Sequence, residues 1–184
     1  MCMKNNEMKY YFEEELIMFH SIEEFIEEWS HEAASTQKIL DALTDESLNQ
    51  QDNAENRTLA RMAWHVVTSL HEMLSQTGLQ FEGANHESPV PDSAKEIAES
   101  YRTTSQNMLN SIKENWKDES LKEMDDMYGE QWQKGLTLAV INKHQIHHRG
   151  QMTVLMRLAG LKVPGVYGPS RDEWVQMGIE IPVV

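Results

Sequence analysis

Four segments of the chain repeat apolar residues every three or four positions, the period of one face of an amphipathic helix. They cover about residues 21–43, 57–77, 93–116 and, from a start between 131 and 137, the stretch up to 160. The residues between them are polar or include glycine and proline, which favours loops. No segment has the convincing alternation of a strand. Four long amphipathic helices predict an all-α protein, a four-helix bundle.

Capping residues mark several helix ends. Ser21 followed by Glu24, and Ser93 followed by Glu96, have the spacing of a capping box, in which each side chain reaches the other's backbone N–H. Gly78 is a natural stop for the second helix. These residues set the helix boundaries more sharply than the apolar stripes do.

The connections before the second, third and fourth helices are each about a dozen residues long. We expect a turn of helix over residues 45–50 in the first connection, and a turn at Tyr128-Gly129 in an otherwise irregular third one. Connections of this length either span one end of a bundle or cross it. The order of the helices in space therefore stays open.

The 184 residues suit one domain with a core of its own. We expect an N-terminal arm over residues 1–20, the bundle domain over residues 21–175 and a C-terminal tail over residues 176–184. Because residues 161–184 include three prolines and three glycines, this end of the chain is expected to be irregular, extended or turned rather than one helix.

The acidic charge of the chain argues against two classes of binding partner. Asp and Glu number 30 against 16 Lys and Arg, a formal net charge of −14. This balance argues against binding to nucleic acid and to an anionic membrane, since both attract basic surfaces. No apolar run approaches the length of about twenty residues that spans a bilayer, and residues 1–12 lack the apolar core of a signal peptide. With Cys2 as the single cysteine, we expect a soluble, cytoplasmic protein.

The fourth segment places imidazoles on the face that its apolar residues mark as buried. Residues at the spacing of that face are Val140, His144, His148, Gln151, Val154, Leu155 and Leu158. Two histidines four residues apart project from the same side, with Cβ atoms about 6 Å apart. They can hold one metal ion, given a third ligand from another helix. His65, beside the apolar stripe of the second segment, is the candidate, whereas His31 and His86 are expected at the surface.

These residues also resemble a known family. The run His144-x-x-x-His148-Arg149-Gly150-Gln151, the pair Trp64-His65 and the tail segment 164–170 together resemble the DinB/YfiT-like family, over about residues 21–175. The resemblance implies a metal-binding four-helix bundle, often a homodimer, with His65, His144 and His148 as ligands. It also implies kinship with thiol S-transferases that use low-molecular-weight thiols such as bacillithiol or mycothiol, beside relatives with isomerase or proposed hydrolase activity.

Three imidazoles suit a divalent transition metal, with zinc or nickel favoured and iron as a further candidate. Three protein ligands leave a coordination position open, as in catalytic zinc sites. We favour a metal-dependent thiol S-transferase acting on a small thiol and an electrophile. A metal-dependent hydrolase is the alternative, and a non-catalytic metal-binding or stress-related binding protein is a third. A carboxylate beside the ion would favour hydrolysis, and a basic pocket for the carboxylates of a thiol would favour transfer.

Residues near the candidate ligands have functional and structural interpretations. Glu72 is a weak candidate for a general base, because position alone favours a solvated glutamate. Gln151 is a weak candidate too, and either orients a ligand ring, binds substrate or packs between helices. Arg149 is expected in a structural ion pair or a dimer contact, and Gly150 at a close approach of helices. Trp64 is expected in the core.

Overall fold

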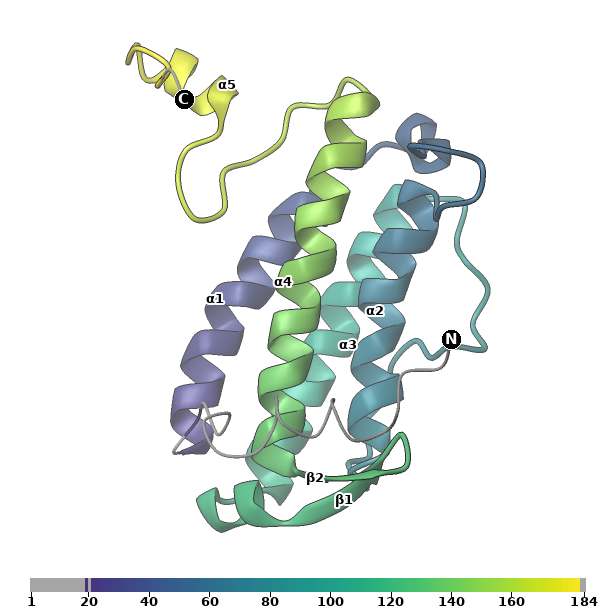
Figure 1. The fold of residues 1–184 in the computed structure, drawn as a ribbon, viewed down its shortest axis with the longest axis vertical. Coiled ribbons are helices and arrows are strands. Elements are labelled where there is room, and N and C mark those ends of the chain that lie inside the picture. The colour runs from purple at the N-terminus through teal and green to yellow at the C-terminus, as the bar shows by residue number, and fades with distance from the viewer. Residues whose placement is uncertain (1–18, 20, 183–184) are drawn as a thin grey trace, which may run out of the picture.

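The chain forms a bundle of four long helices in a computed structural model that describes Phe19 and residues 21–182 (Figure 1). The helices are α1 (Ile22–Asp41), α2 (Leu59–Ser75), α3 (Ala94–Asn115) and α4 (Lys134–Leu158). The predicted all-α four-helix bundle is confirmed. Most of the predicted arm over residues 1–20, with Cys2, lies outside the described residues. No helix in the described part of the chain is long and apolar enough to cross a membrane.

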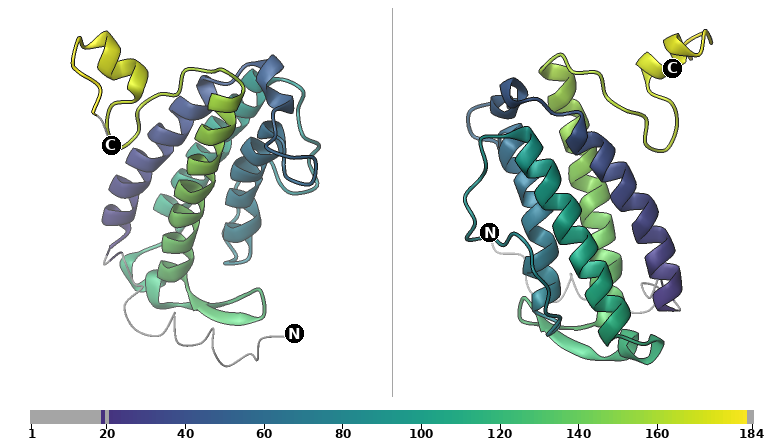
Figure 2. Two further views of the ribbon diagram at one scale, coloured as in Figure 1. Left: turned by 45° about the horizontal axis from the view of Figure 1, so that its top comes forward. Right: turned by 180° about the vertical axis from the view of Figure 1, so that it is seen from behind.

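The second connection crosses the length of the bundle, which settles the helix order. The backbone N–H of Ala94 donates to Asp45 Oδ1 at 2.7 Å, so α3 begins at the same end as α2. The N–H of Ile22 donates to Asp118 Oδ1 at 2.9 Å, so α1 begins where α3 ends. Residues 76–93 therefore run back along the side of the bundle (Figure 2). In this arrangement α4 packs between α1 and α2, and α3 packs on their other side.

The core is built from the apolar faces of the four helices. Trp29 and Tyr101 are almost fully buried there, and burial of each large apolar side chain contributes about 1.5–3 kcal/mol. Their polar atoms are satisfied inside the core: Trp29 Nε1 donates to Ser105 Oγ at 3.1 Å, and Tyr101 Oη donates to Gln145 Oε1 at 2.6 Å. Trp64 is also buried, as predicted, and its Nε1 donates to the Ser88 carbonyl of the crossing connection at 3.0 Å.

The buried face of α4 is not the one predicted. Val154 and Leu158 were expected to face the core, but they are 55% and 56% exposed. Gln145 and Arg149 are buried instead, at 0% and 2% exposure. The prediction failed because it took apolar residues as the sign of burial, whereas this face of α4 buries polar side chains that have partners on other helices. The face that carries the histidines is half-buried.

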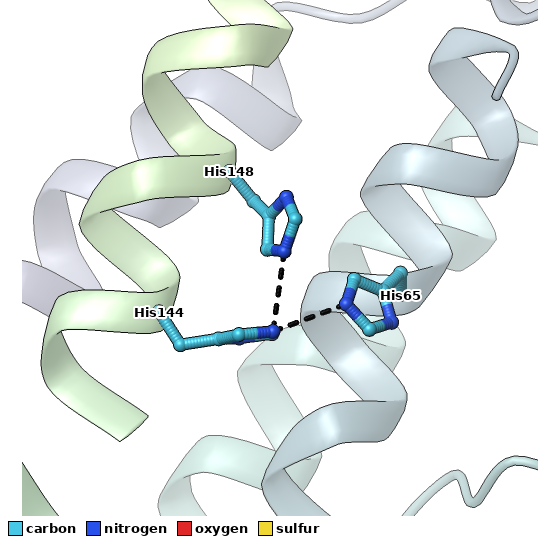
Figure 3. A group of neighbouring side chains, drawn as sticks. All are labelled: His65, His144 and His148. Atoms are coloured by element: carbon cyan, nitrogen blue, oxygen red, sulfur yellow. Dashed lines mark hydrogen bonds between the residues drawn. The ribbon is translucent and has the colours of Figure 1, made fainter. Parts of the chain in front are cut away.

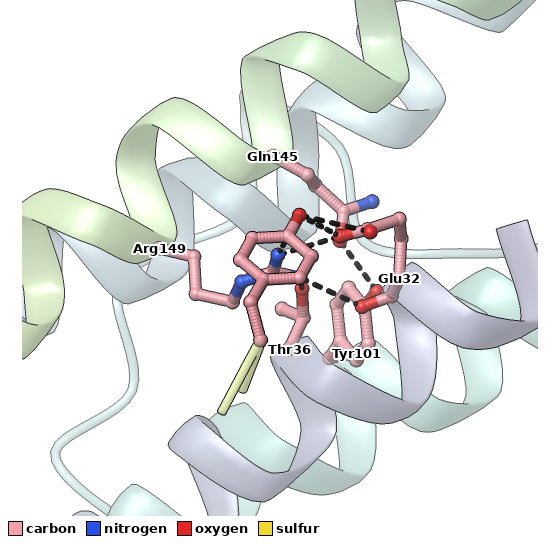
Figure 4. Close-up of polar contacts among 6 residues, drawn as sticks. Glu32, Thr36, Tyr101, Gln145 and Arg149 are labelled. Atoms are coloured by element: carbon pink, nitrogen blue, oxygen red, sulfur yellow. Dashed lines mark hydrogen bonds and ion pairs between the residues drawn. The ribbon is translucent and has the colours of Figure 1, made fainter. Parts of the chain in front are cut away.

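A buried ion pair joins α4 to α1 and confirms the structural ion pair predicted for Arg149 (Figure 4). Arg149 Nη2 pairs with the Glu32 carboxylate, while Nη1 donates to the Glu32 carbonyl at 3.0 Å and to Thr36 Oγ1 at 3.2 Å. Tyr167, from the chain after α4, donates to Glu32 at 2.9 Å. The close approach of helices predicted at Gly150 is wrong. This residue lies on the exposed side of α4, and a Cβ there would have no atom within 4 Å.

The third connection contains a β-hairpin that the sequence did not reveal. After a short 3-10 helix, η3 (Asp118–Lys122), strands β1 (Met124–Met127) and β2 (Glu130–Gln133) pair antiparallel, with Met124 opposite Gln133. The predicted turn at Tyr128-Gly129 is confirmed: both residues have positive φ, 58° and 84°, as a tight hairpin turn requires. The expectation of no strand is therefore wrong here, because four-residue strands are too short to show an alternation.

The chain after α4 is irregular, as predicted, except for one short helix. Residues 159–170 form no helix, and α5 (Arg171–Gln176) follows with a capping box at Ser170. Earlier in the chain, the turn of helix expected over residues 45–50 is the 3-10 helix η2 (Asp45–Asn49). It is followed by the loop that leads into α2, and this loop lies against the histidine-bearing face of α4.

Candidate metal centre

Three histidines from two neighbouring helices point their Nε2 atoms at one another (Figure 3). His65 comes from α2, and His144 and His148 come from successive turns of α4. The Nε2 atom of His144 lies 3.1 Å from that of His65 and 3.2 Å from that of His148. The cluster forms because α2 and α4 are adjacent in the bundle and the i, i+4 spacing puts two rings on the same side of α4.

The separation of these nitrogens fits a single metal ion. Imidazole nitrogens bind zinc at about 2.0–2.1 Å, so two ligands in tetrahedral geometry are about 3.3 Å apart. The distances of 3.1 and 3.2 Å are close to that value. Among the described residues, the group that can hold a metal consists of these three side chains.

The electrostatics of the site favour metal binding at neutral pH. The pKa of both His65 and His144 is lowered to about 4, chiefly by burial and in smaller part by neighbouring positive charge, that of Arg57 included. Burial also lowers the pKa of His148. Metal ligation requires neutral imidazole, because a protonated nitrogen has no lone pair to donate. At pH 7 the rings of His65 and His144 are therefore neutral, and protons do not compete with a metal ion for their nitrogens.

Gln151 fixes the orientation of one ligand ring. Its Oε1 atom accepts a hydrogen bond from His148 Nδ1 at 2.7 Å. With the proton on Nδ1, the lone pair of Nε2 faces the other two histidines, which is the usual arrangement around ligating histidines. The amide nitrogen of Gln151 lies 3.0 Å from His147 Nε2. The hydrogen bond to Nδ1 is the contact that Gln151 needs to orient the ring of His148.

The other candidates lie apart from the cluster. Glu72 is two turns along α2 from His65, and its carboxylate accepts a hydrogen bond from Tyr128 of the hairpin at 3.0 Å. It is not a member of the histidine group. His31 and His86 are exposed, as expected.

A pocket of about 470 Å³ opens beside His148. Its lining comprises Asp52, Asn56, Arg57, Met62, His148, Gln151, Val154 and Leu155. The loop before α2 supplies Asp52, Asn56 and Arg57, whereas α2 and α4 supply the apolar residues together with His148 and Gln151. Sequence reasoning missed the loop residues because a loop has no periodicity that tells which way a side chain points. Volumes of this size hold small molecules, so a ligand in the pocket would reach the metal centre.

Comparison with known proteins agrees with this geometry. The model of the DinB family matches residues 18–180. The uncharacterized protein YrdA of Bacillus subtilis is 46% identical over 165 residues, which cover 90% of this chain and 99% of YrdA. The crystal structure of a DinB-like protein from Bacillus cereus is similar, with a TM-score of 0.79, 48% identity and coverage of 82% of this chain and 100% of that one. The DinB-like protein YjoA of Bacillus subtilis shares the fold, with a TM-score of 0.61 at 15% identity over 80% of this chain and 99% of its own.

Proposed function

The chain belongs to the DinB family, and we propose that it is a metal-dependent thiol S-transferase with His65, His144 and His148 as the metal ligands. The observation that carries the proposal is the convergence of three neutral imidazoles beside a pocket of ligand size. Three ligands, with no fourth one among the described residues, leave a coordination position for a reactant. Zinc or nickel suits this donor set best, and iron suits it as well.

When bound, a divalent ion would supply Lewis-acid chemistry, lowering the pKa of a thiol at the open position so that a thiolate forms at neutral pH. In the transfer, the proton of the thiol goes to solvent when the thiolate forms, a bond then forms between the sulfur and an electrophilic carbon, and the bond from that carbon to its leaving group breaks, so that the group departs with the electron pair. The side chains of Met62, Val154 and Leu155 exclude water from one side of the reactants. Gln151 holds the ring of His148 in place.

Hydrolysis on the same site is the second candidate, because one carboxylate, that of Asp52, lines the pocket. A general base works best with a pKa near the pH of the reaction. The hydrogen bond from the Asn56 side chain lowers the pKa of Asp52, which makes it a poor base. The carboxylate of Glu72 is engaged by Tyr128. The chain therefore offers hydrolysis little support, and it favours transfer.

A thiol conjugation assay tests the proposal. Zinc- or nickel-loaded protein is mixed with a panel of small thiols, bacillithiol included, and chlorodinitrobenzene, and the thioether product is quantified by absorbance. We expect product formation above the uncatalysed rate with wild type and with His31→Ala, an exposed histidine on α1 outside the cluster, and none with His144→Ala. Equal rates for all three proteins would contradict the proposal. Metal retention without turnover on any thiol would favour the non-catalytic binding protein.

The homodimer expected from the resemblance stays a proposal. Several large apolar side chains are more than 45% exposed on α4 and after it, among them Val154, Leu158, Val175 and Met177. Exposed apolar surface of this kind favours burial against another chain. The molar mass in solution, measured by light scattering, tests whether the protein is a dimer.

A further inference from the structure

Arg57 is an exposed cation in the lining of the pocket. It lines the same cavity as His148, and it forms no ion pair with any described residue. Asp52 is the one carboxylate in the same lining, and Asn56 Nδ2 donates to both of its oxygens, at 3.0 and 2.9 Å. The guanidinium is thus left available to a ligand.

Part of the pocket lining is apolar. Met62, Val154 and Leu155 contribute to its lining, and Val154 is 55% exposed although it is a β-branched aliphatic residue. A ligand that fits this cavity has an anionic group for Arg57 and a hydrocarbon part for the apolar side. Guanidinium groups bind carboxylates with two parallel hydrogen bonds, which makes a carboxylate the matching anion.

From this placement we infer that the pocket selects a thiol that carries a carboxylate, and that Arg57 is the residue that binds this carboxylate. The inference rests on the proposed function, since the thiol sulfur of the same ligand occupies the open position of the metal centre. Arg57 and His148 line one cavity of about 470 Å³, so one small molecule contacts both. With a net charge of −14, the chain as a whole repels anions. The positive charge of Arg57 offsets this repulsion locally, so that a carboxylate can bind in the pocket.

A matched pair of thiols isolates the contribution of Arg57. The protein is loaded with Co²⁺, and binding of mercaptopropionate or of its methyl ester is followed by the sulfur-to-cobalt charge-transfer absorption. The ester has the same thiol and carbon chain but no charge. We expect Arg57→Gln to weaken mercaptopropionate binding roughly tenfold and to leave the affinity for the ester unchanged, since a hydrogen-bonded charge contributes about one order of magnitude. Arg61→Gln, an exposed arginine one turn along α2 and outside the pocket lining, is the control and should bind both thiols like wild type.

The outcomes separate this inference from the proposed function. If Arg57→Gln leaves the ratio of the two affinities unchanged, Arg57 does not bind the carboxylate and the inference fails, while the thiol site stands. If neither thiol gives a charge-transfer band in wild type, the proposed thiol chemistry fails as well. A preference of the enzyme for iodoacetate over iodoacetamide, lost in Arg57→Gln without any change in thiol binding, would place the carboxylate on the electrophile and overturn its assignment to the thiol.

Discussion

Replacing one partner of the buried ion pair between Glu32 and Arg149 is the substitution of a polar residue that we expect to destabilise the fold most. The two residues are only 4% and 2% exposed, so replacing Arg149 with Met would leave the Glu32 carboxylate charged inside the protein. Of its hydrogen bonds in the native structure, only those from the Tyr167 hydroxyl, at 2.9 Å, would remain. Breaking a buried ion pair by removing one partner costs about 3–5 kcal/mol.

That cost converts to a large change in melting temperature. Unfolding entropy is about 2.1 cal/mol/K per residue, so a protein of 184 residues loses about 2–4 °C for each kcal/mol. We therefore expect Arg149→Met to lower the melting temperature by about 10 °C. The double variant Glu32→Met/Arg149→Met removes both charges and fills the space with side chains of similar size. It should recover most of the loss, because replacement of a whole buried pair by apolar residues is often neutral.

Thermal and urea unfolding followed by far-UV circular dichroism measures both effects in a double-mutant cycle. The control is Arg102→Met, which breaks the exposed pair of Arg102 with Asp41, where the side chains are 46% and 48% exposed. Its melting temperature should stay near that of wild type, since solvent screens this pair. If Arg149→Met melts like the control, or if the double variant is no more stable than the worse single variant, the account of the buried pair is wrong.

Three further predictions concern the tail and the metal centre. Tyr167→Phe removes hydrogen bonds to Glu32 and Arg149, so limited proteolysis should cut residues 161–182 faster than in wild type. Gln151→Ala should weaken zinc binding 10- to 100-fold in a chelator competition, whereas Gln151→Glu, which keeps the acceptor, should not. The metal-free protein should lose stability as the pH falls from 6.5 to about 4, because His65 and His144 have pKa values near 4 when folded and the unfolded chain takes up protons first. Urea midpoints that stay constant over this range would contradict the burial of the two rings.

The sequence predicted the fold well where burial follows apolarity. The stripes of α1, α2 and α3 and the capping residue Ser21 placed the helices to within a few residues. On α4 the same rule failed, because Gln145 and Arg149 are buried with partners on α3 and α1 that no pattern in α4 reveals. The path of residues 76–93 was also beyond sequence reasoning. It depends on a long-range contact between Asp45 and Ala94, and the length of a connection does not encode such a contact.

The candidate site, like the fold, has residues that the sequence predicted and residues that it did not. His144 and His148 were predictable because a helix fixes the relation between residues four apart. The grouping of His65 with them rested on the resemblance and on the need for a third ligand from another helix, and the structure brings all three together. Arg57 and Asp52 were missed because their positions depend on the conformation of an irregular loop. Sequence periodicity identifies ligands on helices, whereas the substrate side of this pocket is visible only in three dimensions.

The most direct test of the central claim is the metal content of the untagged protein, since a polyhistidine tag would bind metal itself. Wild type, His144→Ala and the control His31→Ala, at an exposed histidine of α1, are analysed by inductively coupled plasma mass spectrometry, as purified and after incubation with Zn²⁺ or Ni²⁺. We predict about one divalent ion per chain in wild type and His31→Ala, and loss of that ion in His144→Ala. Absence of metal from wild type after incubation, or equal metal in all three proteins, would contradict a metal centre formed by His65, His144 and His148.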